Sequence, residues 1–116
     1  MENCIFCKII NKEVPAKILY EDDDIIAFND VHPIAPVHIL IIPKKHIESV
    51  NDFGINDINL IGGMILIAKK LAQDEGIAKN GYKLLFRVGE NGGQEISHVH
   101  IHLIGGAKLD EVIKPV

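Results

Sequence analysis

The sequence lacks the features that mark several classes of protein. Tryptophan is absent and aromatic residues make up only 5% of the chain, so few side chains are available to stack on the bases of a nucleic acid. Acidic residues outnumber basic ones, and the formal net charge of −4 argues against nonspecific nucleic-acid binding. No apolar run approaches the roughly 20 residues that span a bilayer. We therefore expect neither a nucleic-acid partner nor a membrane partner.

Cysteine is also scarce, with only Cys4 and Cys7 in the chain. The N-terminal segment MENCIFCKII shows none of the basic, apolar and small-residue regions of a signal peptide, so we expect a cytoplasmic protein. In that compartment two cysteines are more often a metal-binding pair, a redox pair or buried thiols than a disulfide. A thioredoxin-like redox pair would need a βαβ context, which the pattern does not show.

The residues that are present indicate one globular domain spanning residues 1–116. Of the 116 residues, 47% are hydrophobic and 24% are charged. A chain of this length buries roughly 65% of its unfolded surface, which is enough for a core without disulfides.

Apolar periodicity predicts two helices. A short amphipathic helix is expected at residues 4–13 and a long one at 57–75, capped by Asn56 or Asp57 and ended by Gly76. Two glycines lie inside the long helix, and each should cost about 1 kcal/mol relative to alanine. Close approach of another element, such as a partner subunit, could offset the cost of Gly62 and Gly63.

β-rich runs predict an antiparallel sheet, because they are joined mostly by short links. The acidic residues 22–24 are interpreted as a solvated hairpin turn rather than a cation site, since the liganding pattern of a calcium loop is missing. We therefore expect an α+β fold whose five strands lie at residues 17–21, 25–30, 38–43, 82–88 and 97–105.

The segment GGQEISHVHIHLIGG, residues 92–106, carries the strongest chemical signal. His98, His100 and His102 alternate with apolar residues, and on a strand such positions share one face with a repeat of about 6.6–6.8 Å. They could be a polar face without function, a three-histidine zinc site with an open position for water, or a nucleophile with two helpers. In the last case a neutral imidazole attacks phosphorus, and its neighbours fix its tautomer and donate to the phosphoryl oxygens.

The loop before these histidines favours the phosphoryl reaction. Gly92 and Gly93 allow backbone amides to approach an anion, and Gln94 can bond to a phosphate oxygen. A bare zinc site does not need such a loop. The remaining histidines near the sheet, His32 and His38, are expected to be mostly structural.

This segment resembles the signature of the histidine-triad (HIT) family, His-φ-His-φ-His with φ apolar. Residues 4–47, CIFCKIINKEVPAKILYEDDDIIAFNDVHPIAPVHILIIPKKHI, resemble the N-terminal half of its Hint-like branch. The resemblance implies a five-stranded antiparallel sheet per subunit and a homodimer whose sheet continues across the interface. It also implies hydrolysis or transfer at the α-phosphorus of a nucleotide, without a cofactor in catalysis. The typical substrates of Hint-like members are purine nucleoside 5′-phosphoramidates and acyl-adenylates.

The resemblance further implies roles for single residues. His100 would be the nucleophile and His102 would contact the phosphate. Gln94 and the backbone of Gly93 would position the phosphate and the leaving group.

The nucleoside would be held on the other side of the phosphate. Asp30 would accept from both ribose hydroxyls, with Val31 beside the sugar or base. An apolar slot for the base is implied, although the packing of the first helix explains the same residues as well: Ile5, Phe6 and Ile9.

Two residues depart from the family's pattern. Arg87 stands where the family commonly has an asparagine near the phosphate, and it would add a cation and a bidentate fork if it reaches the site. Glu95 stands where some Hint-like proteins have a serine that protonates the leaving amine. A carboxyl with a raised pKa could serve as that acid, and a solvent-facing residue without a role is the alternative.

Some bacterial members of the family bind zinc through two cysteines and two histidines. The resemblance therefore implies a structural zinc held by Cys4, Cys7, His46 and His98, with free thiols as the alternative. As a zinc ligand, His98 would tie the first helix to the catalytic strand and would not be a free acid or base.

The sequence thus predicts a nucleotide hydrolase that forms a nucleotidyl-histidine intermediate on His100. The alternatives are a dinucleoside polyphosphate hydrolase of the same family, a nucleotide-binding regulatory module with little turnover, and a three-histidine metallohydrolase from outside the family. The Hint-like N-terminal half and the LIGG that follows the triad favour the Hint branch.

Overall fold

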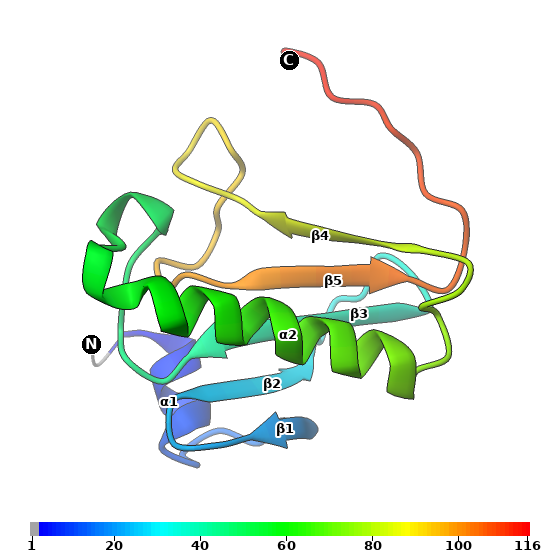
Figure 1. Cartoon of the computed structure of the whole chain (residues 1–116). Helices are drawn as coiled ribbons and strands as arrows, with labels where there is room; N and C mark the ends of the chain where they lie inside the picture. Colours follow the sequence, from blue (N-terminus) through cyan, green and yellow to red (C-terminus); the bar gives the residue numbers. More distant parts are fainter. Residues whose placement is uncertain (1–2) are drawn as a thin grey trace.

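The chain forms an antiparallel sheet with one helix on each face. A computed structural model describes residues 3–116. The strands lie in the order β1-β2-β3-β5-β4, each antiparallel to its neighbours (Figure 1). This confirms the predicted α+β fold with five antiparallel strands, a short helix and a long one. The elements are α1 (Ile5–Ile10), β1 (Ile18–Glu21), β2 (Ile25–Asn29), β3 (Val37–Pro43), α2 (Ile58–Asp74), β4 (Tyr82–Phe86) and β5 (Ile101–Gly105), with 3-10 turns at Val50–Asp52 and Ile55–Asp57.

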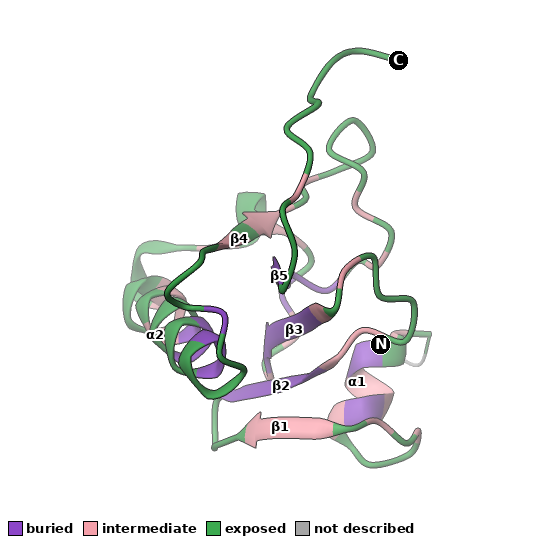
Figure 2. Ribbon diagram, turned by 90° about the vertical axis from the view of Figure 1, so that its right-hand side faces the viewer, coloured by how far each residue is buried: buried purple, intermediate pink, exposed green. Residues whose placement is uncertain are grey.

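Side chains alternate between the two faces of the sheet, and a different helix covers each face (Figure 2). The larger core lies between α2 and one face, and the smaller core lies between α1 and the other. Both cores use β2 and β3. The α2 core contains Met64, Ala68 and Leu71 against Ile25, Ile39, Ile41, Ile101 and Leu103. The α1 core contains Phe6 and Ile9 against Ile26, Phe28, Leu40 and Ile42.

β3 is the central strand, which explains why its sequence HILIIP is apolar at positions facing both sides. It pairs with β2 on one side and with β5 on the other. Every residue from His38 to Pro43 is buried. His38 is the one polar side chain in this run, and its parity places it on the α1 face together with Leu40.

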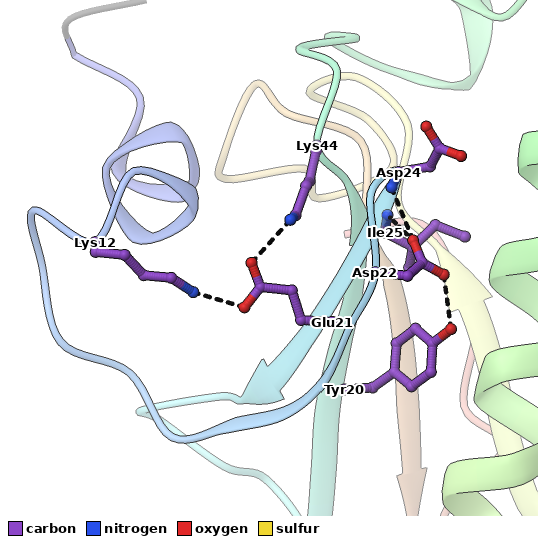
Figure 3. Close-up of polar contacts among 7 residues, drawn as sticks. All are labelled: Lys12, Tyr20, Glu21, Asp22, Asp24, Ile25 and Lys44. Atoms are coloured by element: carbon purple, nitrogen blue, oxygen red, sulfur yellow. Dashed lines mark hydrogen bonds and ion pairs between the residues drawn. The ribbon is translucent and has the colours of Figure 1, made fainter.

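The acidic run closes the β1–β2 hairpin, as predicted. One oxygen of Asp22 accepts from two backbone amides that follow it in the turn, each at 2.8 Å (Figure 3). Its other oxygen accepts from the Tyr20 hydroxyl at 2.6 Å. The neighbouring Glu21 forms ion pairs with Lys12 at 2.6 Å and Lys44 at 2.8 Å. These contacts hold the edge strand β1 at the end of α1.

The predicted long helix is present, but its predicted cap is not made. Asp57 occupies the N-cap position, and its side chain forms no cap hydrogen bond with the helix. Its carboxylate accepts instead from the backbone N–H of Gly54 at 2.8 Å, which closes the preceding 3-10 turn. At the other end Gly76 has a φ of +75°, the left-handed conformation that ends helices.

The two glycines inside α2 differ in their surroundings. A Cβ at Gly63 would lie 3.3 Å from Cδ1 of Ile25, so this glycine permits close packing of α2 on β2. A Cβ at Gly62 would have no neighbour within 4 Å. Gly62 lies on the outer surface of the helix, one turn from Ile58 and from Leu66.

The last strand is shorter than predicted. β5 begins at Ile101, so only His102 of the three alternating histidines belongs to a regular strand. The pairing of Ile41 with Ile101 would place Pro43 opposite Val99, and proline has no N–H for the ladder. Val99 donates instead to the carbonyl of Ile47 at 2.7 Å, and the chain bends at His98. Similarly, β4 ends at Phe86 rather than at residue 88.

Within residues 3–116, no helix combines the length and the apolar character that a bilayer crossing requires.

Candidate active site and metal-binding cluster

Four polar side chains meet on the α1 face of the sheet, outside the apolar core that α1 covers. They are those of Asp30, His38, His100 and His102. The imidazole rings of His100 and His102 are 4.9 Å apart between centroids, and those of His38 and His102 are 5.2 Å apart. Asp30 follows β2, and its backbone N–H donates to the carbonyl of His38 at 2.9 Å. All three histidines are buried. Neighbouring strands therefore place a carboxylate and three imidazoles in one contiguous group.

His100 has the protonation state that a nucleophile needs. Its Nδ1 lies 2.7 Å from the backbone carbonyl oxygen of His98, so Nδ1 carries the proton and donates. Nε2 consequently keeps its lone pair. Burial is the main cause that lowers the pKa of His100 below its ordinary 6.5. The ring of Phe6 packs edge-on against the imidazole at 5.1 Å and holds it in place. The imidazole is therefore neutral and nucleophilic at neutral pH.

His38 fixes the tautomer of His102. The backbone N–H of Ile34 donates to Nδ1 of His38 at 3.2 Å, which leaves the His38 proton on Nε2. This Nε2 donates to Nδ1 of His102 at 2.9 Å. His102 must then carry its own proton on Nε2, pointing away from His38.

The Nε2 of His102 is a buried donor that has no hydrogen-bond partner among residues 3–116. Leaving such a group unpaired costs about 1–3 kcal/mol, so the site is arranged for an acceptor supplied by a ligand. Burial, followed by the neighbouring His100 and His38, lowers the pKa of His102 to about 4. At neutral pH the donor is thus a neutral imidazole.

Sequence reasoning missed His38, which it treated as mostly structural. The sequence offered one signal, which was a single histidine in an apolar strand. It stands two positions before Leu40 and therefore lies on the same face of the strand. Its partner His102 lies 64 residues further along the chain. Only the pairing of β3 with β5 brings these two rings together.

Asp30 is half-buried at the edge of this group. One oxygen accepts from the backbone N–H of His32 at 2.8 Å, and the other lies 3.4 Å from Nε2 of His38. Asp30, His38 and His102 offer ligand atoms within 4.8 Å of one another, close enough for a cation. However, Nε2 of His38 carries a proton and would have to lose it to bind metal. We therefore interpret these residues as a hydrogen-bond network.

A second cluster lies on the other side of His100 and has the chemistry of a zinc site. Cys4, Cys7, His46 and His98 place their ligand atoms within 4.8 Å of one another. Nδ1 of His98 lies 3.4 Å from Sγ of Cys4 and 3.6 Å from Sγ of Cys7. Nδ1 of His46 lies 3.3 Å from Sγ of Cys7. Two thiols and two imidazoles in this arrangement fit a tetrahedral metal ion.

The protonation of His98 suits a metal ligand. Its Nε2 donates to the backbone carbonyl of Pro43 at 2.8 Å, so the lone pair is on Nδ1, facing the thiols. The His98 side chain is fully buried, and burial lowers its pKa to about 4. Burial and the adjacent Cys4 raise the pKa of Cys7 to about 11, so a metal must displace the thiol proton on binding.

The Gly-rich loop is held by its own glutamine. The side-chain amide of Gln94 donates to the carbonyls of Glu48 at 2.6 Å and Ile96 at 3.0 Å. Its oxygen accepts from the backbone N–H of Gly89 at 3.0 Å. Gly93 takes a left-handed φ of +78°, which the turn requires. Gln94 therefore fixes the loop in this structure, and its predicted contact with a phosphate stays a prediction.

The two residues that depart from the family's pattern lie in different places. Arg87 is exposed, and its Nη1 lies 3.7 Å from the point where a Cβ on Gly93 would be. Its positive charge contributes to the lowered pKa of both His100 and His102. Glu95 is exposed and lines a hollow of about 710 Å³ beside the metal-binding cluster, together with Cys4.

The residues predicted for the base slot divide between core and surface. Phe6 and Ile9 are buried in the α1 core. Ile5 is 37% exposed and Val31 is 80% exposed. Packing accounts for the first two residues, while the side chains of Ile5 and Val31 are available to a ligand.

The site consists of a buried, neutral imidazole and a second imidazole with an unpaired donor, held side by side on an antiparallel sheet. This arrangement is a site of the histidine-triad type. The family model described as "Scavenger mRNA decapping enzyme C-term binding" matches residues 3–112. The purine nucleoside phosphoramidase of Escherichia coli K12 is 46% identical over 112 residues, which cover 97% of this chain and 94% of that protein.

Solved structures agree with this assignment. A HIT family hydrolase from Legionella pneumophila superposes with a TM-score of 0.91 at 50% identity, covering 93% of this chain and 96% of that one. A HIT family hydrolase from Clostridium thermocellum has a TM-score of 0.94 at 44% identity, covering 98% and 99%. The chain belongs to the histidine-triad family, in its Hint-like branch.

Proposed function

We propose that the protein hydrolyses purine nucleoside 5′-phosphoramidates, or related adenylylated compounds, through a covalent nucleotidyl-histidine. One observation carries this proposal: His100 has a free lone pair on Nε2, and the neighbouring His102 has a buried donor without a partner. One group can attack phosphorus while the other holds a phosphoryl oxygen. The relative named purine nucleoside phosphoramidase supports this substrate class.

In the first step, Nε2 of His100 attacks the α-phosphorus of the nucleotide. A phosphorus–nitrogen bond to His100 forms as the bond to the leaving amine breaks, and the amine takes up a proton. The proton on Nδ1 of His100 stays on that nitrogen and continues to donate to the carbonyl oxygen of His98, which stabilises the positive charge on the substituted imidazole. Nε2–H of His102 donates to a phosphoryl oxygen as charge develops there.

In the second step, a water molecule attacks the same phosphorus and gives up a proton, which replaces the one taken up by the leaving amine. The bond to His100 breaks, the nucleoside 5′-monophosphate leaves, and His100 recovers its lone pair. Splitting the hydrolysis in this way replaces one difficult displacement with two easier ones.

The remaining predicted residues bind the substrate in this proposal. Asp30 accepts hydrogen bonds from the ribose hydroxyls, and Val31 and Ile5 contact the sugar or base. The backbone of Gly93 and, after release from the loop, the amide of Gln94 position the phosphate. Glu95 is the candidate acid for the leaving amine.

We further propose that the ligand set Cys4, Cys7, His46 and His98 holds a structural zinc ion. Such a closed site supplies folding energy and leaves no open position for chemistry. It joins α1 to the segment that precedes β5. A cytoplasmic location fits two cysteines kept as reduced ligands.

We also propose a homodimer whose sheet continues through β4. This strand is an edge of the sheet, and an open edge is a template for pairing with another chain. Leu84 of β4 is 38% exposed and Leu66 of α2 is 65% exposed. Gly62, with open space around it, would allow a partner's backbone to approach α2 closely.

Turnover of an adenosine 5′-phosphoramidate tests the function. Wild-type protein, the same protein after chelation, His100→Ala and the control His32→Ala are compared, with folding checked by circular dichroism. We expect turnover to persist after chelation and in the control, and kcat/KM to fall by about a thousandfold or more in His100→Ala. Acid-free quenching and mass spectrometry should trap an adenylyl group on the wild type and on the control, and none on His100→Ala. Loss of activity on chelation without unfolding, together with activity retained in His100→Ala, would refute the nucleophile.

A further inference from the structure

The site has opposite charges at its two sides. Asp30 follows β2, and Arg87 follows β4, so the order β2-β3-β5-β4 places the buried histidines between them. Asp30 lies level with His38 at one end of the sheet, and Arg87 follows the last pair of β4 with β5 at the other end, so the two charges lie at diagonally opposite corners of the site. A ligand bound across His100 and His102 therefore has one end near a carboxylate and the other near a guanidinium.

Strand register places Arg87 on the same face as the nucleophile. Leu85 pairs with His102, and Phe86 pairs with Ile101 as the last pair of the ladder, so continuing this register by one position would bring Arg87 opposite His100. Directly opposite residues in an antiparallel pair project to the same side of the sheet. The effect of the Arg87 charge on the pKa of His100 and of His102 agrees with this placement.

The guanidinium of Arg87 is available to a ligand. Within residues 3–116, Arg87 forms no hydrogen bond or ion pair through its side chain. Lys83 lies on the same face of β4, but its ammonium pairs with Glu111 at 3.0 Å and donates to the backbone carbonyl of Asp110. Arg87 is exposed whereas His100 is only 6% exposed, so the guanidinium lies at the solvent side of the reacting group.

We propose that Arg87 selects leaving groups that carry a negative charge, such as an amine bearing a free carboxylate. This inference rests on the proposed function, in which Asp30 binds the ribose. With the nucleoside at Asp30 and the phosphate at His100 and His102, the rest of the substrate lies toward β4. An acidic leaving group is repelled from Asp30 and is bound by the fork of Arg87, which matches a carboxylate in two hydrogen bonds.

A pair of matched substrates tests this specificity. Adenosine 5′-phosphoramidate is linked through nitrogen to β-alanine, either as the free acid or as its primary amide. The measured quantity is the ratio of kcat/KM for the acid to kcat/KM for the amide. The two substrates differ in chemical reactivity, but this difference enters the ratio equally in every variant. It therefore cancels when the ratios of two variants are compared.

We expect the ratio to fall about tenfold in Arg87→Gln, the size of a hydrogen bond to a charged group. Arg87→Lys, which keeps the charge and loses the fork, should have an intermediate ratio. Raising the ionic strength should lower the ratio in the wild type and not in Arg87→Gln. Lys79→Gln removes an exposed charge before the far end of β4 and should leave the ratio unchanged.

Failure of this inference is distinguishable from failure of the proposed function. If the wild type turns over neither substrate, the proposed function is wrong. If the wild type turns over both substrates and Arg87→Gln has the wild-type ratio, Arg87 does not distinguish the acidic leaving group from the neutral one. An equal loss for both substrates in Arg87→Gln would also overturn the inference, because it would place the guanidinium on the phosphoryl group that they share.

Discussion

The backbone carbonyl of His98 lies 2.7 Å from Nδ1 of His100. The ring of His98 belongs to the metal-binding cluster, while its carbonyl fixes the proton of the proposed nucleophile. One residue therefore connects the two centres through its own backbone. A change in the cluster should affect catalysis by moving this carbonyl, although the proposed zinc ion has no chemical role in the proposed reaction.

The first prediction concerns zinc. Purified wild-type protein should contain about one zinc ion per chain, and Cys4→Ser should lose it, because a site with four ligands is weakened when a thiolate is removed. Chelation should lower the Tm and reduce kcat severalfold without abolishing turnover. Metal analysis and thermal unfolding measure both effects, with His32→Ala as the control. Unchanged stoichiometric zinc in Cys4→Ser would contradict this ligand set.

The second prediction concerns His38 as a positioning residue. In His38→Ala, His102 loses the donor that keeps its proton on Nε2, so kcat should fall about 10- to 100-fold with a smaller change in KM. His38→Gln retains an amide donor and should recover part of the rate. Steady-state kinetics on the phosphoramidate measure both constants. Equal kcat values in His38→Ala and the wild type would show that this hydrogen bond is not used.

The third prediction concerns pH and stability. His102 titrates near 6.5 in an unfolded chain and near 4 in the folded protein, because burial disfavours its charged form. Between these values the unfolded state binds the extra proton, so the free energy of unfolding falls as the pH is lowered from 6.5 to 4. At 1.36 kcal/mol per pKa unit, the loss due to His102 is about 3 kcal/mol and is complete below pH 4.

Urea unfolding at several pH values measures this loss in the wild type and in His102→Gln. The variant lacks the titrating group, so its stability should fall less over the same range. Zinc release at low pH affects both proteins and cancels in the difference. Parallel pH dependences would contradict the assignment to His102.

The fourth prediction concerns the proposed dimer. Leu66→Glu places a charge on the exposed apolar face of α2 and should convert the dimer to a monomer, since an unpaired buried charge is costly at an interface. Ile34→Glu is a matched control, because Ile34 is 67% exposed against 65% for Leu66 and lies in the β2–β3 loop. Sedimentation velocity distinguishes the outcomes. A wild-type protein that sediments as a monomer would remove the basis of the proposal.

Much of the fold followed from the sequence because the governing interactions are local. The hairpin around Asp22, the short first helix and the long helix each have their apolar period and turn residues within one segment. The ends of elements were less predictable. β5 begins only at Ile101 because Pro43, distant in the sequence, cannot extend the ladder, and Asp57 bonds to the turn before the helix rather than to the helix.

The sequence by itself determined the family, the order of the elements and the residue types available for chemistry, since the motif GGQEISHVHIH is contiguous. The tertiary structure decided the state of each imidazole. A histidine tautomer depends on which atom faces each ring nitrogen, and these atoms belong to residues far away in the chain. His38 meets His102 across 64 positions, and Cys4 meets His98 across 94. Strand pairing and the docking of α1 alone bring these groups within hydrogen-bonding distance.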